Sequence, residues 1–359
     1  MLPVIFDEEY LLKYAKEQKI QPFRVKQIFY ELFKNQNIDW DSMTTLSKDM
    51  RQDFSDNFNI INLSLDKKLE DEQTTKFSFK TFDGYFIEAV LMYHRSKHTK
   101  GKLNRITLCL SSQVGCPMGC AFCVTAKMGL KRNLTRQEII SQVLYVNNYI
   151  KNKFGKKEDG TLRAVRNVVF MGMGEPLLNY DNLKKTIEIL LQRERFSLSK
   201  RHITISTVGV IAGIKKLIQD KIDVGLAVSL HAPTQSLRET IVPNAKVHKM
   251  SELIKVLDNY IKTTNNRIFY EYIMIKGVTD GDDNAKNLVK LLKGQFCHVN
   301  LIPYNENPLV DFQETSTKEI QNFKKILEDG GLTVTIRDSM GREVKSACGQ
   351  LGYDSINKL

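Results

Sequence analysis

Strand-like and helix-like segments alternate along most of this chain, and this alternation limits the fold more than any other feature. Short runs rich in β-branched residues recur at 106–110, 167–171, 202–207, 224–230, 268–275 and 298–302. Segments with apolar residues at helical spacing follow them, at 135–149, 181–192, 211–219, 250–262, 283–293 and 317–329. Such a series predicts an α/β fold with a parallel sheet, here a partial (β/α)6 barrel.

The N-terminal part of the chain has a different pattern. Residues 7–56 show helical periodicity, with a new helix beginning at Pro22. From about residue 60 the period shortens to two, and Asp83-Gly84 separates two alternating runs, as in a β-hairpin. We therefore expect four parts: a small helical and antiparallel-sheet domain at 1–93, a basic linker at 94–105, the barrel at 106–340 and a C-terminal tail at 341–359. A chain of 359 residues suits this division.

Three of the six cysteines lie together in the sequence Gly115-Cys116-Pro117-Met118-Gly119-Cys120-Ala121-Phe122-Cys123. Thiolates spaced C-x3-C-x2-C on a glycine-containing loop can converge on one compact inorganic centre, and sulfur ligands favour iron–sulfur or zinc. A closed zinc site or a self-contained ferredoxin cluster needs four ligands, and the sequence has no fourth Cys or His at ligand spacing here. The motif predicts a [4Fe-4S] cluster with one open iron.

This spacing, with an aromatic residue before the last cysteine, resembles the radical-SAM superfamily; a zinc site or unconnected thiols are the alternative. In that superfamily the reduced cluster cleaves S-adenosylmethionine (SAM) to a 5′-deoxyadenosyl radical. The resemblance therefore implies a [4Fe-4S] cluster and SAM as cofactors, with Cys116, Cys120 and Cys123 as the metal ligands.

Glycine-rich and polar residues follow the expected parallel strands, at the edge where α/β proteins place their ligand sites. The sequence from Met171 to Pro176 resembles the GGE element of the same superfamily, in which Gly174 would allow a close backbone approach and Glu175 would accept a hydrogen bond from an amino group. Other candidate SAM contacts at strand ends are Ser206, Ser229, Leu230, His231 and Asn305. Taken singly, each such residue is more often a turn or cap residue than a ligand.

Seven motifs, spread over nearly the whole chain, extend this resemblance. They are Ser111 to Cys116, Cys120-Ala121-Phe122-Cys123, Lys131 to Leu134, Met171 to Pro176, Ser229 to Pro233, Ile241-Val242-Pro243 and Ala347 to Gln350. Together they resemble the dual-specificity radical-SAM RNA adenine-C2 methyltransferases. That family implies formation of 2-methyladenosine in 23S rRNA, at adenosine 2503 of the peptidyl-transferase centre, and in tRNA at adenosine 37. Many relatives have Ala-Thr-Gly where this chain has Val124-Thr125-Ala126, a departure that leaves the cluster ligands untouched.

The family resemblance also gives roles to residues outside the cluster. Cys348 would carry a methyl group from one SAM molecule, and a second SAM would supply the radical, so that two are used per turnover. Cys109 would then attack the sulfur of Cys348 to release the RNA, and Glu88 would accept a proton. Adenine C2 is an electron-poor carbon, and covalent catalysis splits its difficult alkylation into easier steps. The alternative is a small buried hydrophobe for each cysteine, as we expect for Cys297, and an edge-strand acid for Glu88.

Composition bears on partners and location. A formal net charge of +12 favours a polyanionic partner such as 23S rRNA or tRNA, although a lysine-rich solvated surface is the alternative. The candidate phosphate contacts in the linker are Arg95, Lys97, Lys100, Lys102 and Arg105. No apolar run is long enough to span a membrane, no export signal is visible, and the cysteines are too few for a disulfide framework. We expect a cytoplasmic protein, a monomer, served by a flavodoxin-type electron donor by analogy with the family.

Two other functions remain open at this point. The related adenine-C8 methyltransferases, which confer ribosomal antibiotic resistance, share the cluster and both accessory cysteines, but they typically have Ala after the glutamate where this chain has Glu175-Pro176. The second alternative is an RNA-binding protein with a structural iron–sulfur cluster and no SAM cleavage.

Overall fold

The computed structural model describes residues 2–95, 103–337, 340, 341, 344, 347 and 349–353. Three lysines of the expected basic linker, Lys97, Lys100 and Lys102, lie outside these residues, as does Cys348. Within the described part of the chain, no helix is both long and apolar enough to cross a membrane.

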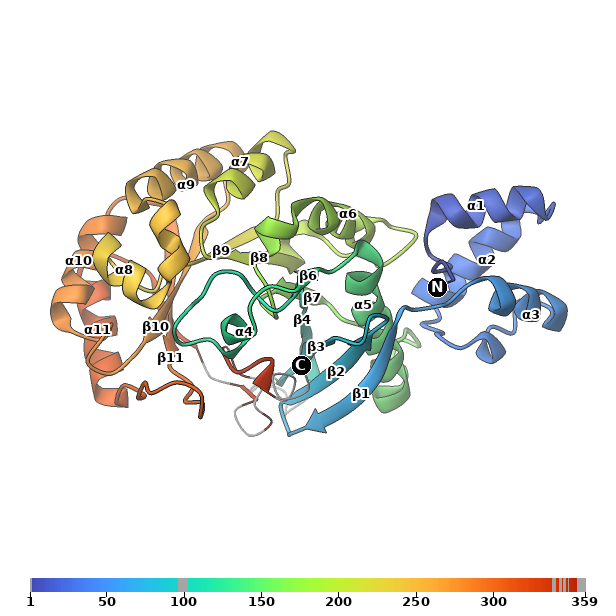
Figure 1. Ribbon diagram of the computed structural model, residues 1–359, viewed down its shortest axis with the longest axis horizontal. Helices are drawn as coiled ribbons and strands as arrows, with labels where there is room; N and C mark the ends of the chain where they lie inside the picture. The colour runs from blue at the N-terminus through green and yellow to red at the C-terminus, as the bar shows by residue number, and fades with distance from the viewer. Residues whose placement is uncertain are drawn as a thin grey trace.

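Three helices form the N-terminal unit: α1 (Glu8–Glu17), α2 (Pro22–Phe33) and α3 (Lys48–Asn57), with a short 3-10 turn, η1 (Trp40–Ser42), before α3. Pro22 occupies the first turn of α2, where its missing N–H costs nothing. The Ser47 side chain caps α3 by accepting a hydrogen bond from Met50 N at 3.3 Å. The helices pack on a buried cluster that includes Leu11, Ile28 and Phe54, and they stand at one end of the molecule (Figure 1).

The expected hairpin is present and belongs to a larger sheet. Strands β1 (Leu63–Glu70), β2 (Thr74–Thr81) and β3 (Phe86–Arg95) run antiparallel. The turn between β2 and β3 closes with a hydrogen bond from Gly84 N to Thr81 O at 3.0 Å, with Gly84 at φ +87°. β3 then pairs antiparallel with β4 (Leu103–Cys109). The segment expected to be an interdomain linker thus connects two neighbouring strands, and a boundary at residue 93 falls inside β3; the division into domains stays a prediction.

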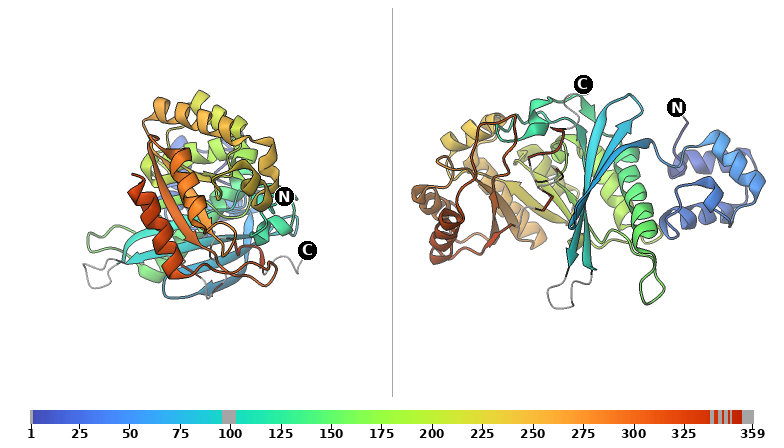
Figure 2. Two further views of the ribbon diagram at one scale, coloured as in Figure 1. Left: turned by 90° about the vertical axis from the view of Figure 1, so that its left-hand side faces the viewer. Right: turned by 90° about the horizontal axis from the view of Figure 1, so that it is seen from below.

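From β4 onward the strands of this sheet are parallel, as the alternation predicted. They are β4, β7 (Asn167–Phe170), β8 (Ile203–Thr207), β9 (Gly225–Ser229), β10 (Ile268–Met274), β11 (Cys297–Pro303) and β12 (Val334–Ile336), paired in this order. Together with the antiparallel strands they make a ten-stranded sheet with β1 and β12 at its edges. The sheet curves without closing, so the partial barrel is confirmed (Figure 2).

The helices between the parallel strands lie outside the curved sheet (Figures 1 and 2). They are α5 (Arg136–Phe154), α6 (Tyr180–Leu191), α7 (Ile211–Gln219), α9 (Met250–Thr264), α10 (Asp282–Leu292) and α11 (Thr317–Asp329). Capping boxes begin α5 at Thr135 and α11 at Ser316. Shorter elements are α4 (Val124–Lys127), α8 (Gln235–Ile241), η2 (Pro176–Asn179), η3 (Lys200–His202), η4 (Pro243–Val247) and the two-residue strands β5 (Gln113–Val114) and β6 (Arg132–Asn133).

Candidate active site

A small hairpin closes the base of the cysteine loop. β5 and β6 pair antiparallel, with Val114 opposite Arg132, and Lys131 N donates to Val114 O at 2.9 Å. Gly115 follows with φ +73°, and a Cβ there would lie 1.7 Å from Gly129 O. Only glycine fits at this crossing. The β5–β6 pairing and the crossing at Gly115 therefore hold the two ends of the cysteine loop close together without any ligand.

Cys120 is buried, Cys116 and Cys123 are half-buried, and the three thiols influence one another. Burial raises the pKa of Cys116 to about 12, and the charge of Cys123 adds to this rise. Burial also raises the pKa of Cys120 well above its usual value, with further contributions from Cys123 and Cys116. These thiols would stay protonated on their own, so ionising all three requires a strongly positive centre such as a metal cluster.

The donor chemistry of this loop, three cysteines on one short segment, fits an iron–sulfur cluster. In the part of the chain that the structure describes, no three His, Cys, Asp or Glu side chains are grouped to hold one metal ion. A [4Fe-4S] core takes each cysteine on a different iron, so its thiolates stand further apart than the ligands of a single ion. Cys116, Cys120 and Cys123 would hold such a cluster and leave its fourth iron open for an exogenous ligand.

The turn after β7 packs directly against the cysteine-loop hairpin. A Cβ on Gly172 would lie 2.6 Å from Leu110 O, and one on Gly174 would lie 2.6 Å from Gln113 Cβ. The close backbone approach that these glycines allow is thus to the chain's own segment before the cysteines. Gln113 fastens the contact, because its Oε1 accepts from Glu175 N at 2.8 Å and its Nε2 donates to Asn133 Oδ1 at 2.8 Å.

Glu175 is 2% exposed, and backbone donors hold its carboxylate. Oε1 accepts from Leu177 N at 3.0 Å, and Oε2 accepts from Val208 N at 2.8 Å. Burial raises the pKa of Glu175 to about 7, although these hydrogen bonds oppose the rise. Its charge in turn raises the pKa of Cys116 and Cys120, so Glu175 lies within electrostatic reach of the cysteine loop.

Strand register places several predicted site residues on one face of the sheet. Paired residues on neighbouring strands point to the same side, and so do residues two apart along a strand. Cys109 pairs with Val90 and Val169, which puts it on the same face as Glu88. Val169 pairs with Thr204, two residues before Ser206. Ser206 pairs with Ala227, two residues before Ser229, so both serines share that face. The structure therefore places these four on one face of the sheet, the inner face opposite the helices.

His231 follows β9 in a left-handed backbone conformation, with φ +60°. Its Nδ1 accepts a hydrogen bond from Ile273 N at 3.2 Å, which leaves the proton on Nε2. Burial lowers the pKa of His231 to about 3, so the ring is neutral. The ring meets Phe122 of the cysteine loop edge to face, with centroids 5.0 Å apart.

The other two predicted SAM contacts follow β9 and β11, the two strands that flank β10 in the sheet. Leu230 is fully buried, and its N–H donates to Val228 O at 2.8 Å. Asn305, after β11, is 4% exposed. Nearby, Asn307 links that strand end to the cysteine loop by donating to Phe122 O at 3.5 Å.

The C-terminal tail is attached to the cysteine loop and to β3. Val124 N donates to Gly349 O at 2.8 Å, and Thr125 Oγ1 donates to Leu351 O at 2.7 Å. Gly352 N donates to Glu88 Oε2 at 3.0 Å, and Glu88 also forms a buried ion pair with Lys76 at 3.8 Å. Gly349, which follows position 348, thus lies beside the cluster loop. Glu88, expected to accept a proton, contacts the tail.

Four residues that sequence reasoning missed take part in this site. Gln113 joins the two loops, and Arg238 of α8 is fully buried beside the ends of β8 and β9. Glu271 on β10 accepts from Asn300 Nδ2 of β11 at 2.9 Å on the same inner face, and burial raises the pKa of Glu271. Glu271 and Asn300 could have been identified as candidate site residues, because each is a polar residue inside an otherwise apolar strand.

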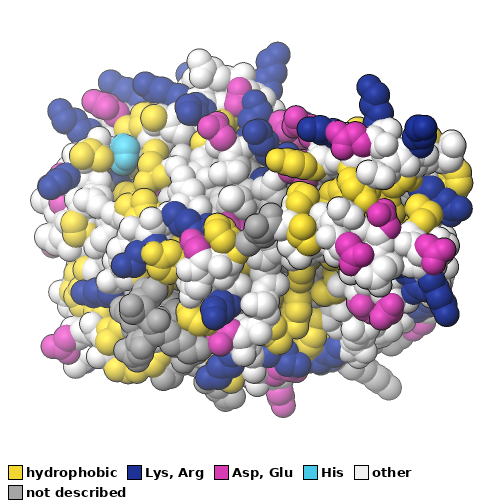
Figure 3. Space-filling model, turned by 45° about the vertical axis from the view of Figure 1, so that its right-hand side comes forward, with side chains coloured by type: hydrophobic (Ala, Val, Ile, Leu, Met, Phe, Trp, Pro, Cys, Tyr) yellow, Lys and Arg dark blue, Asp and Glu magenta, His cyan; other side chains and the backbone are white. Residues whose placement is uncertain are grey.

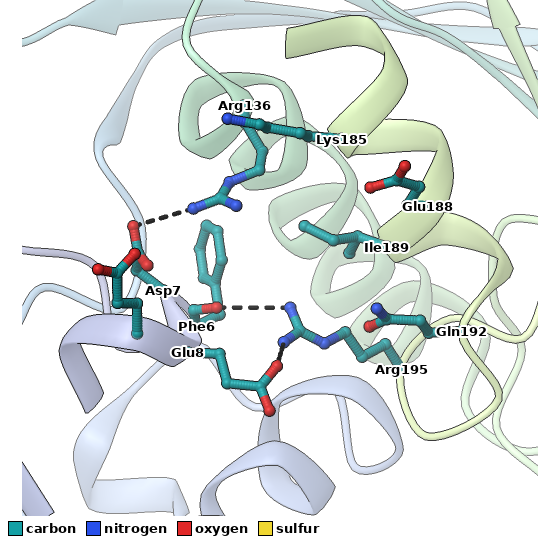
Figure 4. A pocket seen from close by; sticks show the side chains of 10 residues that line it. Phe6, Asp7, Glu8, Arg136, Lys185, Glu188, Ile189, Gln192 and Arg195 are labelled. Atoms are coloured by element: carbon teal, nitrogen blue, oxygen red, sulfur yellow. Dashed lines mark hydrogen bonds and ion pairs between the residues drawn. The ribbon is translucent and has the colours of Figure 1, made fainter. Parts of the chain in front are cut away.

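A separate pocket of about 260 Å³ lies between the N-terminal unit and helices α5 and α6 (Figure 4). Asp7 pairs with Arg136 at 3.0 Å, and Glu8 pairs with Arg195 at 2.7 Å. None of the predicted site residues lines it. We interpret it as the junction between the helical unit and the barrel.

Positively charged side chains are distributed over the surface of the protein. Lys and Arg side chains are spread over the face in Figure 3, with Asp and Glu among them. Aromatic side chains on the helical unit are exposed, namely Tyr10, Phe23 and Tyr30. Exposed aromatics among basic residues are the groups that bind RNA through stacking and phosphate contacts.

Comparison with known proteins agrees with this site. Residues 110–289 match the model of the radical SAM superfamily. The chain is 36% identical to a radical SAM methyltransferase from Sphaerobacter thermophilus of known crystal structure, with a TM-score of 0.89 over 98% of this chain and 99% of that one. The fold and the cysteine loop thus define a radical-SAM protein.

Curated relatives narrow the family further. A probable dual-specificity RNA methyltransferase RlmN from Aquifex aeolicus is 42% identical over 96% of this chain and 94% of the relative. One from Clostridium novyi is 38% identical over 93% and 92%. Within the radical-SAM superfamily, the chain belongs to the RlmN family of RNA methyltransferases.

Proposed function

We propose that this protein forms 2-methyladenosine in 23S rRNA, at adenosine 2503, and in tRNA, at adenosine 37. Cys116, Cys120 and Cys123 would hold a [4Fe-4S] cluster, with SAM bound between Glu175 and the ends of β8, β9 and β11. When bound, the reduced cluster supplies the electron that splits SAM into the radical. The residues of this chain bind and orient the cofactor and carry the transferred carbon.

The attachment of the C-terminal tail carries this proposal. The hydrogen bonds from Val124 to Gly349 and from Thr125 to Leu351 join the tail segment that follows position 348 to the residues that follow the last cluster ligand. These contacts support a cysteine of the tail as the group that meets a radical formed at the loop. Cys109 lies on the sheet face that includes Glu88, which holds the tail at Gly352. This supports Cys348 as the methyl carrier and Cys109 as the thiol that releases the product.

Two cysteine variants test these roles. If Cys348 carries the carbon, Cys109→Ala still permits bond formation to adenine but cannot attack the Cys348 sulfur, so protein stays covalently joined to RNA. Cys348→Ala should give no adduct. Denaturing electrophoresis with labelled RNA measures both outcomes. A crosslink in the Cys348 variant, or none in a folded and iron-loaded Cys109 variant, would overturn the assignment.

The position of methylation needs its own measurement. Mass spectrometry of digested 23S rRNA and tRNA, against 2-methyladenosine and 8-methyladenosine standards, identifies the product. We expect 2-methyladenosine in both RNAs. A product methylated only at C8 would contradict the proposal, and an intact reduced cluster that yields no 5′-deoxyadenosine would indicate a binding protein.

A further inference from the structure

A buried arginine stands between the cysteine loop and the sheet. Arg238 lies on α8, and its side chain is 0% exposed. Nε donates to Leu230 O at 3.1 Å, and Nη2 donates to Val208 O and, at 3.4 Å, to Ser229 O. Each of these carbonyls lies at the end of β8 or β9. The sheet therefore holds the guanidinium at two of its three nitrogens.

The third nitrogen, Nη1, is buried and has no hydrogen-bond partner within the part of the chain that the structure describes. A buried charged donor without an acceptor is costly, so such an atom indicates a missing partner. The three carbonyl acceptors at the ends of β8 and β9 are used by Nε and Nη2. The partner of Nη1 must therefore be another group at this end of the sheet.

The cysteine loop contacts the helix that carries this nitrogen. Ala121 N, next to Cys120, donates to Ile241 O at the end of α8 at 2.9 Å. Arg238 and Ile241 are three residues apart on α8 and both are buried, so they lie on the same face of this helix. The guanidinium therefore lies on the side of α8 that meets the cysteine loop beside Cys120.

We infer that Arg238 is a positioning residue for the iron–sulfur cluster, with Nη1 donating to sulfur at the Cys120 corner and the guanidinium balancing the negative charge of the ligated cluster. This inference depends on the cluster proposed above. Three thiolates give a [4Fe-4S] core a net negative charge that increases on reduction. A buried cation with a hydrogen bond to sulfur stabilises the reduced form and raises its reduction potential.

The test compares charge with packing in the reconstituted full-length protein. Arg238→Gln keeps a hydrogen-bonding side chain without the charge, and Arg238→Lys keeps the charge. Tyr260→Phe is a matched control, because it removes a buried hydrogen bond of 2.7 Å to Val224 O just before β9. The midpoint potential of each is measured without SAM by a redox titration followed by electron paramagnetic resonance. The dissociation constant for SAM is measured separately.

We expect a more negative potential in Arg238→Gln, and potentials near that of the wild type in Arg238→Lys and Tyr260→Phe. A folded Arg238→Gln that loses iron, while Arg238→Lys retains it, would also support charge compensation. Unchanged potential with weaker SAM binding would overturn the inference and assign Nη1 to the SAM carboxylate. Equal effects in all three variants would overturn it in favour of packing alone. A wild-type protein that binds no cluster would instead contradict the proposed function.

Discussion

At the scale of single residues, the site depends on side chains held by the backbone of neighbouring loops. Gln113 and Glu175 connect the cysteine loop, the turn after β7 and the end of β8. The sequence allowed Glu175 to be predicted, because it follows a glycine-rich turn after an apolar strand. Gln113 and Arg238 could not be predicted in these roles, because their partners are distant in sequence and become neighbours only in the folded sheet.

The cysteine ligands give a direct prediction at this scale. Each is expected to hold one iron, so Cys116→Ala, Cys120→Ala and Cys123→Ala should each abolish the cluster and with it SAM cleavage. Iron analysis and electron paramagnetic resonance of the anaerobically reconstituted protein measure the loss. Cys297→Ala is the control and should keep full iron content. A cluster retained at wild-type level in any of the three would show that the ligand assignment is wrong.

Glu175 predicts a pH dependence of stability. Its pKa rises on folding from 4.5 to about 7, so the folded state binds the proton more tightly than the unfolded state. Its contribution is therefore favourable below pH 4.5 and is lost as pH rises through 7, by roughly 3 kcal/mol at most. Relative to Glu175→Gln, the wild-type apoprotein should become less stable between pH 5 and pH 8. Thermal unfolding of both proteins across this range measures the difference, and parallel curves would contradict the prediction.

At the scale of elements, sequence periodicity predicted the strands and helices whose formation depends on local sequence. The six β/α units were found because apolar strands and amphipathic helices have distinct periods. The helices α4 and α8 were missed because each spans at most two turns, too short for a period to show. The pairing of β3 with β4 was also missed, because a run of basic residues between them resembled a linker and strand pairing depends on contacts outside either strand.

The contact between α4 and the tail can be tested alone. Thr125→Val removes the hydroxyl that donates to Leu351 O and keeps the shape of the side chain. We expect a loss of about 1 kcal/mol of unfolding free energy and faster amide exchange in the tail. Hydrogen exchange followed by mass spectrometry measures the second effect. Thr234→Val, which removes a cap of α8, is the control and should leave tail exchange at the wild-type rate.

At the scale of the whole molecule, hydrogen bonds and ion pairs from α1, α2 and the segment after α2 join the N-terminal unit to the barrel. Arg195 is 5% exposed; it pairs with Glu8 and lies over the rings of Phe29 and Phe33, 4.9 Å and 5.5 Å from their centroids. Because this guanidinium contacts both α1 and α2, it contributes to the attachment of the helical unit. The expected accessory unit is thus a set of helices next to a continuous sheet.

Arg195 therefore provides the prediction for this junction. Arg195→Gln should lower the free energy of unfolding by about 1–3 kcal/mol, since it removes a charge-assisted hydrogen bond and two cation–aromatic contacts. It should also speed proteolysis between α3 and β1. Lys184→Gln, which breaks an exposed pair with Asp220, is the control and should change neither. Equal protease resistance of the Arg195 variant and the wild type would contradict this account.

The tail contacts have a consequence for how this protein tolerates mutation. Three of the tail's anchoring atoms belong to its backbone, at Gly349, Leu351 and Gly352. Gly349 and Gly352 have φ +84° and +92°, and a Cβ on Gly352 would lie 2.6 Å from Met128 Sδ. A saturation library of the tail should therefore accept almost no replacement at the two glycines, and chiefly apolar side chains at 351, where Leu351 is buried. Selection would thus act on the backbone path of the tail as well as on its side chains.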